Sequence, residues 1–233
     1  MLEVGWHVTM MGVGLTLAVY VWVIILFLFR DQGIRPRFIN LASILLLLWI
    51  MFQSALALNR WYMDRNSAWP HWLFAVLFPC LLMMLQFTLS RARNWAKTIQ
   101  NSGLIWLHLL RIPLAWLLTW LSVDHQLPMR WTYFGWNFDI VFGVTAPIVA
   151  ILWQRGHRGA WIRGWHFAGL ASLLWLWIGG LLSTAGAWQV WDVNAPNYAF
   201  VHFPFIWIPT FILPILIWSH SLSLQKNHAS IES

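Results

Sequence analysis

Two ionisable side chains stand inside apolar stretches of this sequence, where a charge is costly. Arg111 lies near the middle of one stretch, and Asp139 lies near the start of the next. An arginine is not neutralised by losing a proton, so it needs an anion, water or a ligand beside it. At about 1.5 Å rise per helical residue, their Cα atoms are expected to differ in depth by roughly 10 Å. A direct ion pair and a gap filled by water or a polar ligand both remain open.

Further polar residues gather around the outer ends of the same stretches. Asn137 precedes Asp139, while Asn197 and His202 precede the last apolar stretch. Similar positions hold Gln53, Ser183, Thr184 and Asn194. If these helices adjoin, their side chains form a polar vestibule with Arg111 at its floor. The alternative is a set of separate caps and interhelical hydrogen bonds. The ligand-binding candidates are Arg111, Asp139, Asn137, Asn197 and His202.

Histidines suggest a second chemistry. His7 and His202 are expected near the outer boundary, and His108 and His166 nearer the inner one. Pairs of neutral imidazoles on facing helices are axial ligands of b-type haem, so these four are the alternative haem or metal ligands. No third ligand accompanies Asp139 and His202 for a zinc site, and the leading expectation is no cofactor. The other histidines are expected at the interfaces: His71, His125, His157, His220 and His228.

The last apolar stretch carries three prolines, Pro204, Pro209 and Pro214. Each proline removes an intrahelical donor and clashes with the preceding turn. The freed carbonyls must be satisfied by neighbouring helices or by water in a cavity. The three prolines therefore predict either a fixed kink or a hinge beside a binding site.

Composition identifies the class of protein. Charged residues make up 9% of the 233 residues, against about 25% in soluble proteins. Hydrophobic residues make up 60%, and 21 residues are Trp. This composition excludes a soluble enzyme. The net charge is +7, but the basic residues lie in short clusters and form no single basic stripe, which excludes a nucleic-acid-binding domain. The only lysines, Lys97 and Lys226, lie outside the apolar stretches, which excludes a retinal Schiff base.

Seven stretches are long enough to cross the roughly 30 Å hydrocarbon core as helices. They are residues 5–29, 38–58, 70–89, 103–122, 136–153, 164–187 and 199–222. The expected fold is therefore all-α, a polytopic bundle of seven transmembrane helices. It forms a single domain over residues 1–222, followed by a short tail over 223–233. Most tryptophans are expected in belts at the membrane interfaces.

Basic residues predict the orientation of the bundle. The odd-numbered loops hold Arg30, Arg35, Arg37, Arg91, Arg93, Lys97, Arg155, Arg158 and Arg163. The even-numbered loops hold Arg60, Arg65 and Arg130. Cytoplasmic loops carry the excess of Lys and Arg. The N-terminus is therefore expected outside and the C-terminal tail in the cytoplasm.

Three motifs carry a resemblance: Arg111-Ile-Pro113, Asn137-Phe-Asp followed by Thr-Ala-Pro147, and Phe203-Pro-Phe-Ile-Trp-Ile-Pro209 continuing to Pro214. From Leu110 on, the chain resembles a widespread group of small, functionally uncharacterised bacterial multi-pass membrane proteins. The resemblance implies a bacterial inner membrane and attaches no activity.

The leading hypothesis is an inner-membrane protein that binds a small polar or amphipathic ligand in an outward-facing pocket, for transport or sensing. The first rival is a membrane enzyme or electron carrier that uses the intramembrane histidines. The second is a structural subunit of a larger membrane complex. The expected partners are the lipid bilayer, the ligand, and other membrane subunits or further copies of the chain, with no nucleic acid.

Overall fold

The computed structural model describes residues 4–28, 36–64, 67–89, 98–157 and 159–229. The long elements are α1 (Trp6–Leu28), α2 (Pro36–Leu58), α3 (Trp72–Thr88), α5 (Asn101–Leu107), α6 (Arg111–Val123), α7 (Asp139–Gln154), α8 (Ala160–Leu182) and α9 (Leu213–Ala229). Short 3-10 turns are η1 (Trp61–Met63), η2 (His108–Leu110), η3 (Met129–Trp131) and η4 (Ala199–Val201), and η5 (Ile208–Ile212) is a π-helix. Within these ranges the chain is all-helical, as predicted, with no strand.

Five stretches of the described residues are long and apolar enough to cross a membrane. They are Trp6–Leu28, Ile39–Leu58, Asn101–Val123, Ala160–Leu182 and Ile208–Lys226. The helices α3 and α7 are apolar but shorter. This arrangement indicates a membrane-embedded protein. Of the residues that predicted its orientation, Arg30, Arg35, Arg65, Arg91, Arg93, Lys97 and Arg158 lie outside the described residues.

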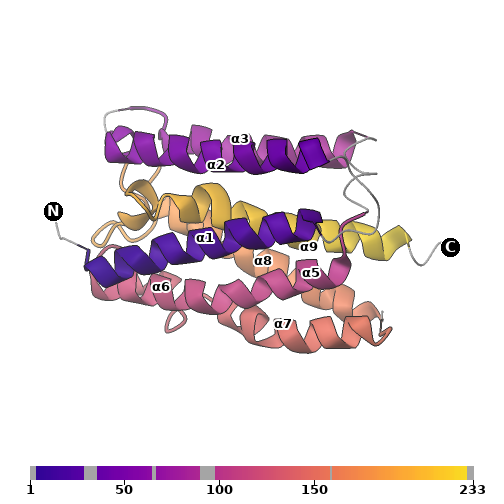
Figure 1. Cartoon of the computed structure of the whole chain (residues 1–233). Coiled ribbons are helices and arrows are strands. Elements are labelled where there is room, and N and C mark those ends of the chain that lie inside the picture. The colour runs from indigo at the N-terminus through magenta and orange to yellow at the C-terminus, as the bar shows by residue number, and fades with distance from the viewer. Residues whose placement is uncertain (1–3, 29–35, 65–66, 90–97, 158, 230–233) are drawn as a thin grey trace.

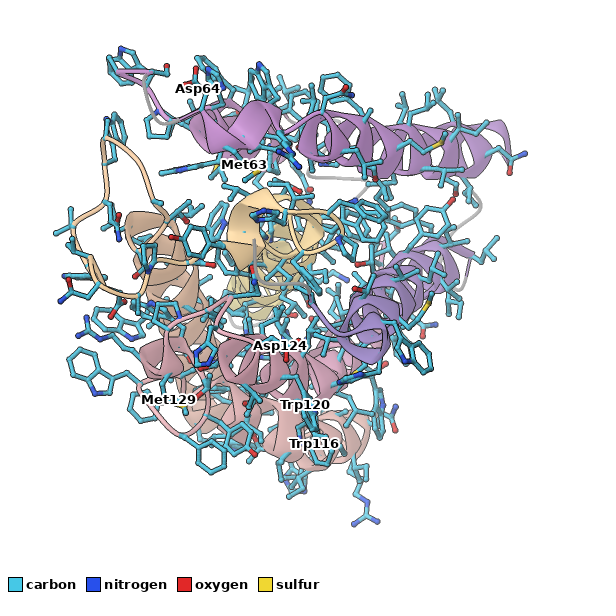
Figure 2. The ribbon with its side chains drawn as sticks, turned by 90° about the vertical axis from the view of Figure 1, so that its left-hand side faces the viewer. Met63, Asp64, Trp116, Trp120, Asp124 and Met129 are labelled. Atoms are coloured by element: carbon cyan, nitrogen blue, oxygen red, sulfur yellow. The ribbon has the colours of Figure 1, made fainter. Side chains whose placement is uncertain are left out.

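The helices run broadly along one direction, with α2 and α3 side by side against one flank of the others (Figure 1). The start of α1 and the end of α9 lie at opposite ends of the bundle (Figure 1). Figure 2 looks onto the end at which α1 begins, where Met63, Asp64, Asp124 and Met129 lie in the connections.

The core of the bundle is α9. In the span Ile208–Lys226, which joins η5 to α9, 83% of the most apolar stretch is buried, against 17% in the span of α2. Helix α9 packs against α8, α5 and α3, and the preceding η5 packs against α1 and α3. The large apolar side chains of α2 and α3 remain exposed on their outer faces, as expected for surfaces that contact lipid.

The prolines of the last stretch fall where the helix is irregular. Pro209 lies inside η5, Pro214 lies in the first turn of α9, and Pro204 precedes both after a cis peptide bond. In η5 the N–H of Leu213 donates to the carbonyl of Ile208, five residues earlier. The helix therefore changes register where two prolines remove backbone donors.

Two indoles, the half-buried one of Trp49 and the buried one of Trp177, replace the missing donors. Pro214 has no N–H to offer the carbonyl of Thr210, and Nε1 of Trp49 on α2 donates to that carbonyl at 3.0 Å. The carbonyl of Pro209 accepts from Nε1 of Trp177 on α8 at 2.9 Å. These tryptophans lie inside the bundle because they satisfy carbonyls that apolar surroundings would leave unpaired.

We expect Trp177→Phe to lower the free energy of unfolding by about 1–3 kcal/mol, because it leaves the buried Pro209 carbonyl without a donor. The matched control is Trp116→Phe, since Trp116 is 55% exposed on α6. Thermal unfolding in detergent measures both changes. Equal losses in the two variants would show that the indole hydrogen bond contributes nothing.

Candidate functional site

The guanidinium of Arg111 is fully buried at the start of α6. Its Nη2 donates to a carboxylate oxygen of Asp139 on α7 and, at 3.3 Å, to the carbonyl of Gly169 on α8. Its Nη1 donates to Nε2 of His220 on α9 at 3.0 Å. The ring centroid of Phe142 lies 4.8 Å from the guanidinium carbon. This one side chain therefore joins four helices.

Asp139 is buried as the first residue of α7. The Ser172 hydroxyl donates to the carboxylate oxygen that contacts the guanidinium, and the backbone N–H of Asp139 donates to Oδ1 of Asn137 at 2.9 Å. The connection that precedes α7 enters the bundle, because Trp131 and Thr132 within it are fully buried. Asp139 therefore lies deeper than counting along the sequence suggests. Of the two arrangements left open by the sequence, the structure has the direct ion pair.

Three histidines adjoin the guanidinium. Nδ1 of His166 lies 2.9 Å from Nδ1 of His220, and the rings of His108 and His220 stack with centroids 3.8 Å apart. Nε2 of His108 lies 3.3 Å from the hydroxyl of Ser219. The indole of Trp165 packs against all three imidazoles, with ring centroids 5.0–5.6 Å apart. All three histidines are fully buried.

We call this group the arginine–histidine cluster. Its members are Arg111, Asp139, Ser172, His108, His166, His220 and Ser219.

The hydrogen bonds assign a tautomer to each histidine. Arginine is only a donor, so Nε2 of His220 must accept from Arg111, and the ring proton of His220 lies on Nδ1. That proton is donated to Nδ1 of His166, whose own proton therefore lies on Nε2. The Ser219 hydroxyl donates to a backbone carbonyl of α5, so it accepts from Nε2–H of His108. Three neutral imidazoles thus lie beside one ion pair.

Local sequence explains how the helices place these groups. The 3-10 turn η2 brings His108 and Arg111, three residues apart, onto one side of the chain. Pro113 is tolerated because it lies in the first turn of α6. On α8 a glycine allows the close approach, since a Cβ at Gly169 would lie 2.5 Å from Nε2 of His220.

Four atoms of the cluster are buried without a hydrogen-bond partner among the described residues. They are Nε of Arg111, Oδ2 of Asp139, Nδ1 of His108 and Nε2 of His166. Unpaired polar atoms are rare inside proteins, so these four atoms are candidates to bind water, an ion or a proton. Nδ1 of His108 is an open acceptor, and Nε2–H of His166 is an open donor.

Across the described residues, no group of three or more His, Cys, Asp or Glu side chains is arranged to hold a metal ion. Of the alternative haem ligands, His108 and His166 lie in the cluster, where one ring nitrogen of each makes a hydrogen bond. His7 is exposed and packs edge-on against Trp120. Haem ligation stays a prediction.

The remaining ligand-binding candidates lie apart from these contacts. Asn197 is buried, donates to the carbonyl of Gly180 at 2.8 Å and accepts from the N–H of Phe200. His202 is half-buried and bonds through Nδ1 to the carbonyl of Tyr198. Both bond to nearby backbone, whereas Asn137 caps the first residue of α7 beside the cluster.

Sequence reasoning placed His220 at the interface, and this was wrong. The expected last span ended at residue 222, so His220 was counted as terminal. In the structure α9 continues to Ala229, and His220 is fully buried. The signal in the sequence was the apolar run from Ile215 to Trp218 before it, together with Leu222 and Leu224 after it, although serines lie between them.

We expect Arg111→Gln and Asp139→Asn each to lower the free energy of unfolding by about 3–5 kcal/mol, because each leaves a buried charge unpaired. The double variant should lose less than the sum, since it removes both charges. Arg130→Gln is the control: Arg130 lies 3.7 Å from Asp192, is 34% exposed, and should lose about 1 kcal/mol or less. Unfolding in detergent tests this cycle, and additive losses would contradict coupling.

Comparison with known proteins places this site in a family. A family model described as "Domain of unknown function (DUF8737)" matches residues 68–226, which is more than half of the chain and includes the whole cluster. The comparison with curated proteins gave no match, and the comparison with solved structures gave none either. A family without known function agrees with the resemblance to uncharacterised proteins. The chain belongs to the DUF8737 family.

Proposed function

We propose that the protein is a proton-linked transporter or sensor of a small amphipathic ligand in a bacterial inner membrane. In this proposal the chain crosses the membrane seven times, with its N-terminus outside and its C-terminus in the cytoplasm. The excess of basic residues in the odd-numbered loops supports the orientation. The resemblance to small bacterial membrane proteins supports the location.

The observation that carries the proposal is the ordered chain of hydrogen bonds from Arg111 through His220 to His166. Buried ionisable groups inside membrane helices are costly, and chains of Asp, Glu and His commonly form proton relays. The Arg111–Asp139 pair is neutral as a unit. The three imidazoles are therefore the groups available to take up one more proton.

Proton uptake has a defined entry point. Nδ1 of His108 has no hydrogen-bond partner among the described residues, so it can accept a proton without breaking a bond. The next step is costlier. A second proton on His220 must bind at Nε2, where it turns the acceptor of Arg111 into a donor and breaks that bond. A second proton on His166 breaks its bond to His220 in the same way.

These bonds connect α9 to its neighbours, so protonation is coupled to the packing of α9. Arg111 belongs to α6 and His166 to α8, and both contact His220 on α9. Directly before α9, the π-helix η5 and the prolines interrupt the regular backbone. This interruption is where α9 would turn relative to the first half of its span, as proposed for a hinge at Pro204, Pro209 and Pro214.

Trp165 provides a built-in reporter for the test, because its indole contacts all three imidazoles. A new cation beside an indole interacts with its π system and changes its emission. We expect the fluorescence difference between the wild type and Trp165→Phe, measured in lipid nanodiscs, to show a pH transition. His108→Gln should remove this transition, because it removes the entry point; the Gln amide keeps a donor for Ser219 but does not titrate.

The matched control is His157→Gln, because His157 is exposed at the end of α7. This variant should keep the transition. A second variant, Gly169→Ala, displaces His220 without removing a titratable group, and its control is Gly164→Ala, where nothing lies within 4 Å of the added Cβ. The proposal would be contradicted if the fluorescence difference between wild type and Trp165→Phe did not change with pH, or if His108→Gln kept the transition unchanged.

A further inference from the structure

A cavity of about 570 Å³ lies between α2, α3 and the last span, away from the arginine–histidine cluster. Its walls are almost entirely apolar and include Leu46 and Trp49 of α2, Phe78 and Leu82 of α3, and Ile215 of α9. Leu82 and Phe78 are also exposed on the outside of the bundle. The cavity therefore reaches the surface that contacts lipid, and a ligand can enter it from the bilayer.

One end of the cavity is polar. Nε1 of Trp218 donates to the side-chain oxygen of Gln86, near the end of α3. Because an indole N–H only donates, the Gln86 atom that faces it must be the oxygen, and this fixes the orientation of the amide. The remaining atom, Nε2 of Gln86, is buried without a hydrogen-bond partner among the described residues. The cavity thus offers one amide NH2 group, with two N–H donors, to a ligand.

The cavity is elongated along the helices. On α2 its lining extends from Ala42 to Phe52, and on α3 from Phe78 to Gln86. At about 1.5 Å per residue, this is a length on the order of 12–15 Å. The donor lies at one end of this length, near the end of α3, and the apolar walls extend from there toward Trp49 and Thr210.

We propose that this cavity binds a single-chain amphiphile whose headgroup is a hydrogen-bond acceptor, such as a carboxylate or an ester. The acceptor bonds to Nε2 of Gln86, and the alkyl chain lies along the apolar walls toward Trp49 and Thr210. An ammonium headgroup is disfavoured, because it has only donors and would face another donor. An alkane fills the same walls but leaves the amide unpaired.

This assignment names the ligand class of the proposed function. Only the coupling between ligand binding and proton uptake rests on that function. Trp218 contacts Gln86 at the cavity, while the next two residues of α9, Ser219 and His220, face the cluster. A ligand at Gln86 and a proton at the histidines therefore act on the same turn of α9. Binding in the cavity does not itself require the histidines to titrate.

The test uses the full chain in phosphatidylcholine nanodiscs with a dodecanoic acid probe that carries a photoreactive diazirine near its chain end. We expect saturable labelling, mapped by mass spectrometry to the segments of α2, α3 and the last span that line the cavity. Dodecanoic acid and its methyl ester should both compete, whereas dodecane and dodecylamine should compete poorly. Competition by the acid alone would restrict the headgroup to a carboxylate.

Two variants with matched controls test the geometry. Gln86→Leu should weaken competition by dodecanoic acid about tenfold, because one hydrogen bond to the headgroup is lost. The same change at the exposed Gln154 of α7 should have no effect. Ala42→Phe should fill the cavity and abolish saturable labelling. Ala55→Phe, at an exposed position of α2 outside the lining, should not.

Labelling that does not saturate, or that spreads over all lipid-exposed helices, would overturn the assignment. Equal competition by dodecane, or an unchanged Gln86→Leu variant, would also do so. Loss of labelling with an intact pH transition of Trp165 would reject the cavity site alone. An absent transition with intact labelling would reject the proton-linked function alone.

Discussion

The charge of Arg111 is permanent, and the side chain that carries it lies in the middle of an apolar bundle. Much of the surrounding structure follows from the need to stabilise this charge. The connection before α7 enters the bundle and so brings Asp139 within reach. A glycine on α8 lets its carbonyl and His220 approach the guanidinium together. Removing the charge would leave four helices without their common contact.

The same charge determines the protonation of the histidines. Because Arg111 donates to His220, the ring proton of His220 must point toward His166. Arg111 therefore fixes the direction of both hydrogen bonds, its own to His220 and that of His220 to His166. A change of protonation at one imidazole changes whether the next one donates or accepts. This linkage distinguishes the cluster from His202, a half-buried histidine whose ring bonds to one backbone carbonyl.

The sequence predicts the helices well, because apolar stretches bounded by charge are a direct signal of membrane helices. It also identified Arg111 and Asp139, since each is a charge among apolar residues. The contact between them was not predictable, because the depth of Asp139 depends on a connection that folds inward around Trp131. The role of His220 was missed for a related reason: it depends on where α9 ends. The amide nitrogen of Gln86 faces the cavity as a donor only because the amide oxygen bonds to Trp218, which is 132 residues away in sequence and could not be paired with it in advance.

The two indoles that bond to the carbonyls of Pro209 and Thr210 have a consequence for biogenesis. Trp49 and Trp177 come from α2 and α8, which are both synthesised before the interrupted segment. When the last span leaves the ribosome, the donors that complete its backbone are already available in earlier parts of the chain. The final segment is therefore poorly suited to insert alone and well suited to insert against a preassembled partner surface. Its irregular backbone therefore depends on the indole donors of α2 and α8.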